Sequence, residues 1–339
     1  MTSHQMLTVY LLFEACKGVG SFWFPYIAVL PQMFGTPPFF NERELQLLPK
    51  DTCTHAKAQI ENVSSAFKEL SAFFELLRGT YPSMSSRLSF ERFRWAWFAV
   101  NTRCVYMKQE NQQGNCALAP YIDLLNHSPE AETEAGFDSS LDCYVVKTET
   151  GCKKWQQAFI CYGPHGNDKL LLEYGFVVPK SRNSSLQFEI DDVICCMDDV
   201  LETESGILLR RKHQILEESN LLCNLSCGWD GLSWHLEIAI KILCMDSKEI
   251  ENWKRVYSSE SVSSNCESKV KQLATRFLTT RLHEEQRVIQ NILDTFPTAM
   301  GNKHLSMIHD LRQEKKNMLE FTLKRLIPEG LKLTVVKLC

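Results

Sequence analysis

Three short segments of this sequence contain the side chains that could do chemistry. They are residues 95–103 (WAWFAVNTR), residues 121–129 (YIDLLNHSP) and residues 160–176 (ICYGPHGNDKLLLEYGF). In the second segment, Asn126 and His127 follow an apolar, strand-like run. Polar residues at such a place either form a turn that satisfies its own backbone or belong to a site in which His127 is a base. No carboxylate and nucleophile complete a triad around this histidine, so both interpretations stay open.

Each of the other two segments, taken alone, also allows both a structural and a functional interpretation. Tyr162 and Tyr174 each stand directly before a glycine, where a side chain either faces a cleft or packs in the core. The aromatic run at residues 95–98 fits a helix core or a ligand cage. Arg103, just beyond it, is either a solvated charge or an anion partner.

Hydrophobic periodicity and helix-ending residues predict the secondary-structure elements that position these residues. Residues 4–17 predict a helix that Gly18 ends. Residues 51–77 carry apolar side chains at steps of three and four and predict a second helix, which Gly79 and Pro82 end. Ser89 is the N-cap of a further helix. From residue 104 to about 191 the sequence contains short runs of residues that favour β-strands. The expected strands there are residues 143–148, 158–163 and 186–190.

After residue 191 the sequence is helical again, with two long amphipathic stripes, the second of which Pro328 should stop. The chain of 339 residues suits two domains. We expect an α+β fold: helices up to about residue 100, a mostly β stretch to about residue 190, and a helical domain at 191–339.

Composition excludes several classes of protein. Apolar residues make up 44% and charged residues 23%, which is the balance of a globular protein rather than a collagen-like or disordered one. The net charge of −4 gives no bulk attraction to nucleic acid or anionic membrane. Residues 261–339 carry an excess of basic residues. That excess fits either solvated helix faces or a surface that meets an acidic partner.

Cysteine usage and the apolar runs set further expectations. The 14 cysteines are dispersed without a C-x-x-C pair or zinc-finger spacing, so we expect reduced thiols and no metal. No apolar run reaches the length of a membrane span, and the N-terminus lacks a signal-peptide pattern, so no membrane partner is expected. Reduced thiols favour the nucleus and the cytosol.

In this order, the three segments resemble the SET-domain protein-lysine methyltransferases, and more narrowly their Rubisco-methyltransferase-like branch. The segments around Asn126 and Tyr162 resemble the two halves of that family's knotted site. Residues 228–244 resemble the start of its helical substrate-binding domain. The resemblance covers residues 7 to at least 260. It implies a mostly β SET domain at residues 1–190 with a helical insertion at about 4–100, followed by the helical substrate-binding domain at 191–339.

The resemblance implies transfer of a methyl group from S-adenosyl-L-methionine to a lysine side chain without a metal. It assigns cofactor binding to five residues: Arg103, Asp123, Asn126, His127 and Tyr162. It makes Tyr174 and Tyr162 the catalytic pair and places Tyr174 and Phe176 in the substrate lysine channel. The attacking amine must be neutral, and a desolvated aromatic channel lowers the lysine pKa from its usual value of about 10.4.

The resemblance also implies a protein substrate, with histone lysines as the leading candidates and nucleosome contact as a further possibility. In this family a strand pair with a Gly-x-Gly turn precedes the first helix, and the sequence is expected to start after it. Gly18-Val19-Gly20 lies after a helix and is therefore a helix stop rather than that turn. The alternative function is a catalytically weak relative that binds a protein partner through its helical domain.

Overall fold

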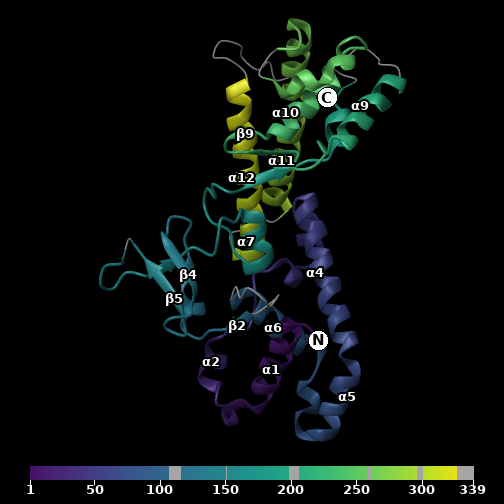
Figure 1. The fold of residues 1–339 in the computed structure, drawn as a ribbon. Helices are drawn as coiled ribbons and strands as arrows, with labels where there is room; N and C mark the ends of the chain where they lie inside the picture. The colour runs from purple at the N-terminus through teal and green to yellow at the C-terminus, as the bar shows by residue number, and fades with distance from the viewer. Residues whose placement is uncertain (107–115, 150, 198–205, 259–260, 296–300, 327–339) are drawn as a thin grey trace. The chain divides into compact units, whose positions relative to one another are not determined.

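The computed structural model describes residues 1–106, 116–149, 151–197, 206–258, 261–295 and 301–326 (Figure 1). The chain divides into two compact units, Met1–Ser181 and Arg182–Cys339. Each unit combines helices with short strands, so the predicted α+β class is confirmed. The division falls before residue 190 because the strand at Ser185–Gln187 pairs with Ser226–Gly228 of the second unit.

The first unit is built mainly from helices. They are α1 (Ser3–Lys17), η1 (Gly18–Gly20), α2 (Phe24–Val29), η2 (Pro37–Phe39), α3 (Glu42–Leu47), α4 (Lys50–Glu69), α5 (Ser71–Thr80), η3 (Pro82–Arg87), α6 (Phe90–Arg103), η4 (Ile122–Leu124) and α7 (Asn167–Tyr174), where η denotes a 3-10 helix. A capping box between Thr2 and Gln5 starts α1, and Gly18 at φ 58° ends it. The predicted helix at 4–17 is therefore confirmed.

The prediction of a single helix over residues 51–77 is wrong in one respect. Two helices, α4 and α5, meet at Leu70, whose backbone (φ −89°, ψ 6°) leaves the helical range. The apolar period runs through this break because Val63, Leu70 and Phe74 all enter the same core. Gly79, expected as the stop, lies inside α5, which ends at Thr80.

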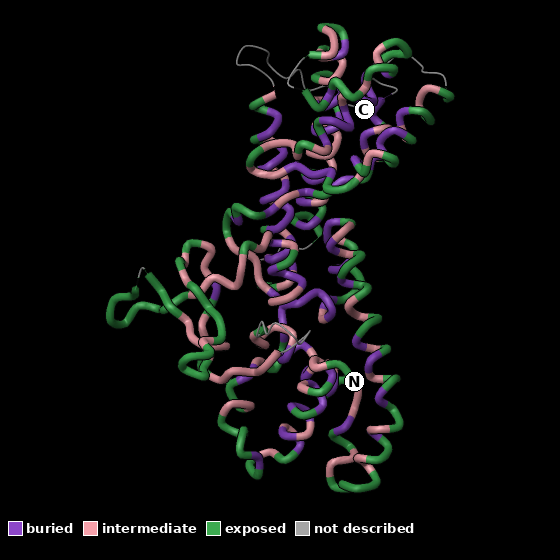
Figure 2. The backbone as a smooth tube through the Cα atoms, in the orientation of Figure 1, coloured by how far each residue is buried: buried purple, intermediate pink, exposed green. Residues whose placement is uncertain are grey.

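An aromatic core joins these helices to α6. The ring centroid of Phe67 lies 5.1 Å from that of Phe74 and 5.3 Å from that of Phe93. Ser89 caps α6 by accepting a hydrogen bond from the Arg92 amide, as predicted. The buried positions follow one side of each of these helices (Figure 2). This core fixes the C-terminal end of α6, where Arg103 lies.

The strands described in the first unit form three pairs. They are β1 (Cys104–Tyr106) with β2 (Cys116–Leu118), β4 (Thr133–Asp138) with β5 (Cys143–Thr148), both antiparallel, and β3 (Asn126–His127) with β6 (Phe159–Ile160), which is parallel. The predicted strand at 143–148 is confirmed, whereas that at 158–163 is shorter. It ends early because Gly163 takes φ 129° and its carbonyl accepts the His165 amide.

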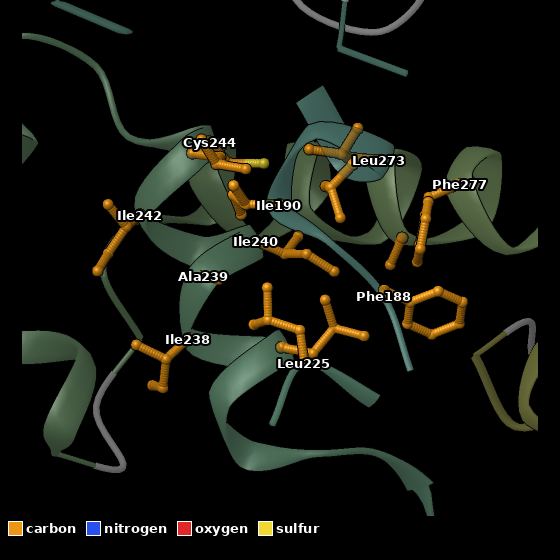
Figure 3. Close-up of a cluster of buried hydrophobic side chains, with 14 of the residues drawn as sticks. Phe188, Ile190, Leu225, Ile238, Ala239, Ile240, Ile242, Cys244, Leu273 and Phe277 are labelled. Carbon is orange, nitrogen blue, oxygen red and sulfur yellow. The ribbon is translucent and has the colours of Figure 1, made fainter. Parts of the chain in front are cut away.

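The second unit has the elements α8 (Ile190–Ile194), α9 (Gly206–Glu218), α10 (Trp234–Cys244), η5 (Glu249–Tyr257), α11 (Ser264–Thr295) and α12 (Lys303–Leu326), with the antiparallel sheet β7 (Ser185–Gln187), β8 (Ser226–Gly228) and β9 (Gly231–Leu232). Its core surrounds α10, and the Phe188 ring packs edge-on against Phe277 at 4.9 Å (Figure 3). This confirms a helical second domain.

Two details of the second unit differ from expectation or fall outside the description. The strand predicted to reach Ile190 ends at Gln187, because Glu189 and Asp192 form a capping box that starts α8. Pro328, the expected stop, lies outside the described residues, and α12 is described to Leu326. Within the described ranges, no helix has the length and apolarity needed to cross a membrane.

Candidate active site

Arg103 and Asp123 form a partly buried ion pair at the end of α6. The Arg103 Nη1 donates to the Asp123 backbone carbonyl at 2.8 Å and lies 3.4 Å from Asp123 Oδ2. The 3-10 turn η4 presents this carboxylate, after Tyr121 has reversed the chain with a positive φ of 78°. The hydroxyl of Tyr26, on α2, donates to the same Oδ2 at 2.6 Å. Three separate segments therefore meet at one carboxylate.

Each member of this pair keeps a buried polar atom without a partner among the described residues. These atoms are Arg103 Nε and Asp123 Oδ1. The Asp123 side chain is 0% exposed and that of Arg103 is 17% exposed. A buried donor or acceptor left unpaired costs about 1–3 kcal/mol. The pair can therefore take a ligand that offers both an anionic acceptor and a cationic donor.

The parallel pairing of β3 with β6 brings the second and third chemical segments together. Asn126 is opposite Phe159, and His127 is opposite Ile160. Immediately beyond this pairing, the Tyr162 amide donates to Nδ1 of His127 at 3.1 Å. Burial lowers the pKa of His127, so its ring is held neutral and accepts this hydrogen bond. Asn126 itself is exposed.

Tyr162, Tyr174 and Phe176 form an aromatic cluster beside His127. The Tyr162 and Tyr174 ring centroids are 4.9 Å apart, and Phe176 lies 6.3 Å from Tyr162 and 6.2 Å from Tyr174. Burial raises the pKa of both tyrosines, that of Tyr174 to about 12. Both hydroxyls therefore stay protonated at neutral pH. Tyr162 donates its proton to the Leu125 carbonyl at 2.7 Å, which leaves its oxygen as an acceptor.

The C-terminal turn of α7 fixes the position of Tyr174. Gly175 ends the helix at φ 77°, and a Cβ at this position would lie 2.7 Å from the Thr36 amide nitrogen and 2.8 Å from the Gly35 carbonyl carbon. Only glycine combines this conformation with such a close approach. The chain direction after Tyr174 is thus set by the segment before η2.

Two side-chain amides hold the residue before Tyr174. Asn101 donates to the Glu173 carbonyl at 3.1 Å and to its Oε2 at 3.0 Å. Gln59, on α4, donates to Oε1 of Glu173 at 3.2 Å and to the Leu172 carbonyl at 3.3 Å. The carboxylate and two of the last carbonyls of α7 are therefore tied to α6 and α4.

The structure brings the sequence-predicted site residues together within the first unit. They are Arg103, Asp123, Asn126, His127, Tyr162, Tyr174 and Phe176. Their individual roles stay predictions. Sequence reasoning gave no role to Tyr26, Gln59 or Asn101, of which only Asn101 lies inside one of the three segments. In the described part of the chain, no group of three or more His, Cys, Asp or Glu side chains is arranged to hold a metal ion.

Comparison with known proteins identifies the kind of protein. The family described as Rubisco LSMT substrate-binding matches residues 205–319. The SET domain of LSMT bound to MeLysine and AdoHcy has the same fold, with a TM-score of 0.58 and 17% identity over 95% of this chain and 74% of that one. Fold and site together define a SET-domain protein of the Rubisco-methyltransferase-like class.

SET domain-containing protein 4 of Mus musculus is 33% identical over 93% of this chain and 72% of its own length. The ribosomal lysine N-methyltransferase set11 of Schizosaccharomyces pombe is 31% identical over 46% of this chain and 38% of its own length. The chain belongs to the SET domain-containing protein 4 family of the SET-domain protein-lysine methyltransferases.

Proposed function

We propose that this protein transfers a methyl group from S-adenosyl-L-methionine to the side-chain nitrogen of a lysine in a protein substrate. The observation that carries the proposal is the pair of buried, unpartnered atoms, Arg103 Nε and Asp123 Oδ1, next to an aromatic cluster. S-Adenosylmethionine ends in an amino acid that carries a carboxylate and an ammonium group, so this donor set fits the cofactor.

The cofactor would be held by residues from all three sequence segments. Arg103 offers a cationic fork to a carboxylate, and Asp123 offers a carboxylate oxygen to an ammonium group. Asn126 and His127 contribute from β3, where the parallel pairing with β6 fixes their backbone. When bound, S-adenosylmethionine supplies a methyl group on a sulfonium sulfur, which is open to attack by a neutral amine.

The aromatic cluster prepares the acceptor amine. Tyr162, Tyr174 and Phe176 are half-buried and form an aromatic surface beside which a bound lysine would lose water. Such a desolvated setting disfavours the ammonium form of lysine. Since the Tyr162 hydroxyl directs its hydrogen at the Leu125 carbonyl, its oxygen can accept a hydrogen bond from the amine and orient the nitrogen lone pair. Tyr174 keeps its proton because its pKa is raised to about 12. It therefore acts by its dipole and position rather than as a base.

We propose histone lysines as the substrate and the second, helical unit as the part that binds the substrate protein. The match of residues 205–319 to a substrate-binding family supports that role for the helical unit. The same proposal places the protein in the nucleus and cytosol. The relative set11 is named for a ribosomal substrate, so ribosomal proteins are the alternative acceptor that an assay must include.

Transfer of labelled methyl from S-adenosylmethionine to purified core histones and to purified ribosomes tests this function. We expect label on lysine in the wild-type reaction and about a hundredfold lower rate with Tyr174→Phe, which keeps the ring and removes the hydroxyl. Tyr144→Phe, on the β4–β5 hairpin, is the matched control and should retain the wild-type rate. Absence of label from both acceptors would contradict the proposed activity. Label on ribosomal protein alone would contradict the histone assignment.

A further inference from the structure

Tyr26 connects the N-terminal helices to the Arg103–Asp123 pair. It lies outside the three sequence segments from which the site was predicted. It lies on α2, 97 positions before Asp123 in the chain, and its hydroxyl donates to Asp123 Oδ2 at 2.6 Å. A hydrogen bond of this length between a phenol and a carboxylate is a strong, charge-assisted one. Its acceptor is the side chain whose other oxygen has no partner.

The bond determines which oxygen of Asp123 is free. A carboxylate is symmetric, so rotation about its last bond would otherwise exchange the two oxygens. Tyr26 and Arg103 both engage Oδ2, and Oδ1 is left buried and unpaired. The Asp123 side chain is 0% exposed, so water does not compete for this arrangement. Tyr26 therefore presents one defined, desolvated acceptor to a ligand.

Tyr26 is itself held in an apolar setting. Its ring lines a pocket with Leu11, Trp23, Ile27 and Leu118. Burial, and then the bond to Asp123, raises the pKa of Tyr26 well above its ordinary value. The hydroxyl is thus a proton donor at every pH at which the protein would be assayed.

We propose that Tyr26 is a positioning residue for the amino-acid end of the cofactor, acting through Asp123. This inference rests on the proposed function, because it needs an ammonium group that Asp123 Oδ1 receives. It differs from a role in which Tyr26 simply ties α2 to η4. A structural tie would affect every ligand of the site, whereas a positioning role affects only ligands that carry the amino acid.

Two ligands separate these roles. S-Adenosylhomocysteine has the amino-acid end, and 5′-methylthioadenosine has the same adenosine and sulfur without it. Calorimetric titration of both into wild type and Tyr26→Phe measures the difference directly. We expect Tyr26→Phe to bind S-adenosylhomocysteine about tenfold or more weakly and to bind 5′-methylthioadenosine as wild type does.

The matched control is Tyr10→Phe, which removes a hydroxyl from the same pocket. Tyr10 accepts a hydrogen bond from Trp23 Nε1 and does not contact Asp123. This variant should bind both ligands as wild type does. A double variant with Asp123→Asn adds a second test. Once the carboxylate is gone, Tyr26→Phe should cause no further loss of S-adenosylhomocysteine affinity.

Three results would overturn the inference: equal weakening of both ligands by Tyr26→Phe, unchanged binding of both, or a Tyr26→Phe protein that no longer folds. Each would leave Tyr26 without a positioning role. A wild-type protein that binds neither ligand would instead contradict the proposed function. The two failures are therefore distinguishable in the same set of titrations.

Discussion

Asn101 donates from one side-chain nitrogen to both the backbone carbonyl and the carboxylate of Glu173, at 3.1 and 3.0 Å. Asn101 lies two residues before Arg103, and Glu173 lies directly before Tyr174. The end of α6 that carries the anion partner is therefore locked to the end of α7 that carries the tyrosine. This contact links the two halves of the site.

Asn101→Ala should consequently slow catalysis without weakening cofactor binding. Loss of the two Asn101–Glu173 hydrogen bonds lets Tyr174 shift. Displacements of about 1 Å near a reacting centre cost about a hundredfold in rate. We expect kcat for methyl transfer to fall about tenfold to a hundredfold, with the Kd for S-adenosylmethionine unchanged. Lys57→Ala, at an exposed position of α4, is the control. An unchanged kcat in Asn101→Ala would show that the Asn101–Glu173 hydrogen bonds do not position Tyr174 for catalysis.

Gly175→Ala should unfold the first unit more easily. The new Cβ would meet the backbone of Gly35 and Thr36, and alanine disfavours φ 77°. We expect a loss of about 2 kcal/mol or more in the free energy of unfolding, measured by urea denaturation. Gly136→Ala is the matched control, because its added Cβ meets nothing within 4 Å and its φ is not positive. Equal effects of the two changes would contradict the close approach at Gly175.

Acidification should destabilise the first unit through His4. Burial lowers the pKa of His4 to about 4 in the folded protein, and its ring packs on Trp97 at 4.2 Å. Because the unfolded chain binds the proton more tightly, with a pKa of about 6.5, stability is full above that value and falls as the pH drops toward 4. The loss should reach about 3 kcal/mol at the low end of this window.

Urea denaturation at pH 7.5 and pH 5 checks this expectation. His4→Phe keeps a ring against Trp97 and removes the titrating group, so it should flatten the pH dependence. His55→Gln, at an exposed position of α4, should leave the dependence as it is in wild type. A pH dependence that persists unchanged in His4→Phe would contradict the assignment to His4.

Sequence reasoning predicted the helices that local signals mark, and it proposed site residues that lie together in the first unit. The Ser89 cap, the Gly18 stop and the polar residues after apolar runs each act within a few positions of the chain. The break at Leu70 was missed because the apolar period continues into the next helix on the same core. The early end of the strand before Ile190 was missed because a capping box of two acidic residues competes with a strand of only three residues.

The supporting residues could not be found in this way. Tyr26 meets Asp123 across 97 positions, and Gln59 meets Glu173 across 114. Neither residue has a local pattern that distinguishes it from an ordinary helix position. Their roles depend on how the N-terminal helices pack against the segment that carries the predicted site. Tertiary contacts of this kind become visible only in the folded structure.

The central claim is that Arg103 and Asp123 hold the amino-acid end of S-adenosylmethionine. Calorimetric titration of S-adenosylmethionine into wild type, Arg103→Met and Arg92→Met tests it most directly, since Arg92 is an exposed arginine on the same helix. The account predicts one site in wild type and in Arg92→Met, and at least about tenfold weaker binding in Arg103→Met. Equal affinity in all three proteins, or no binding to wild type, would contradict it.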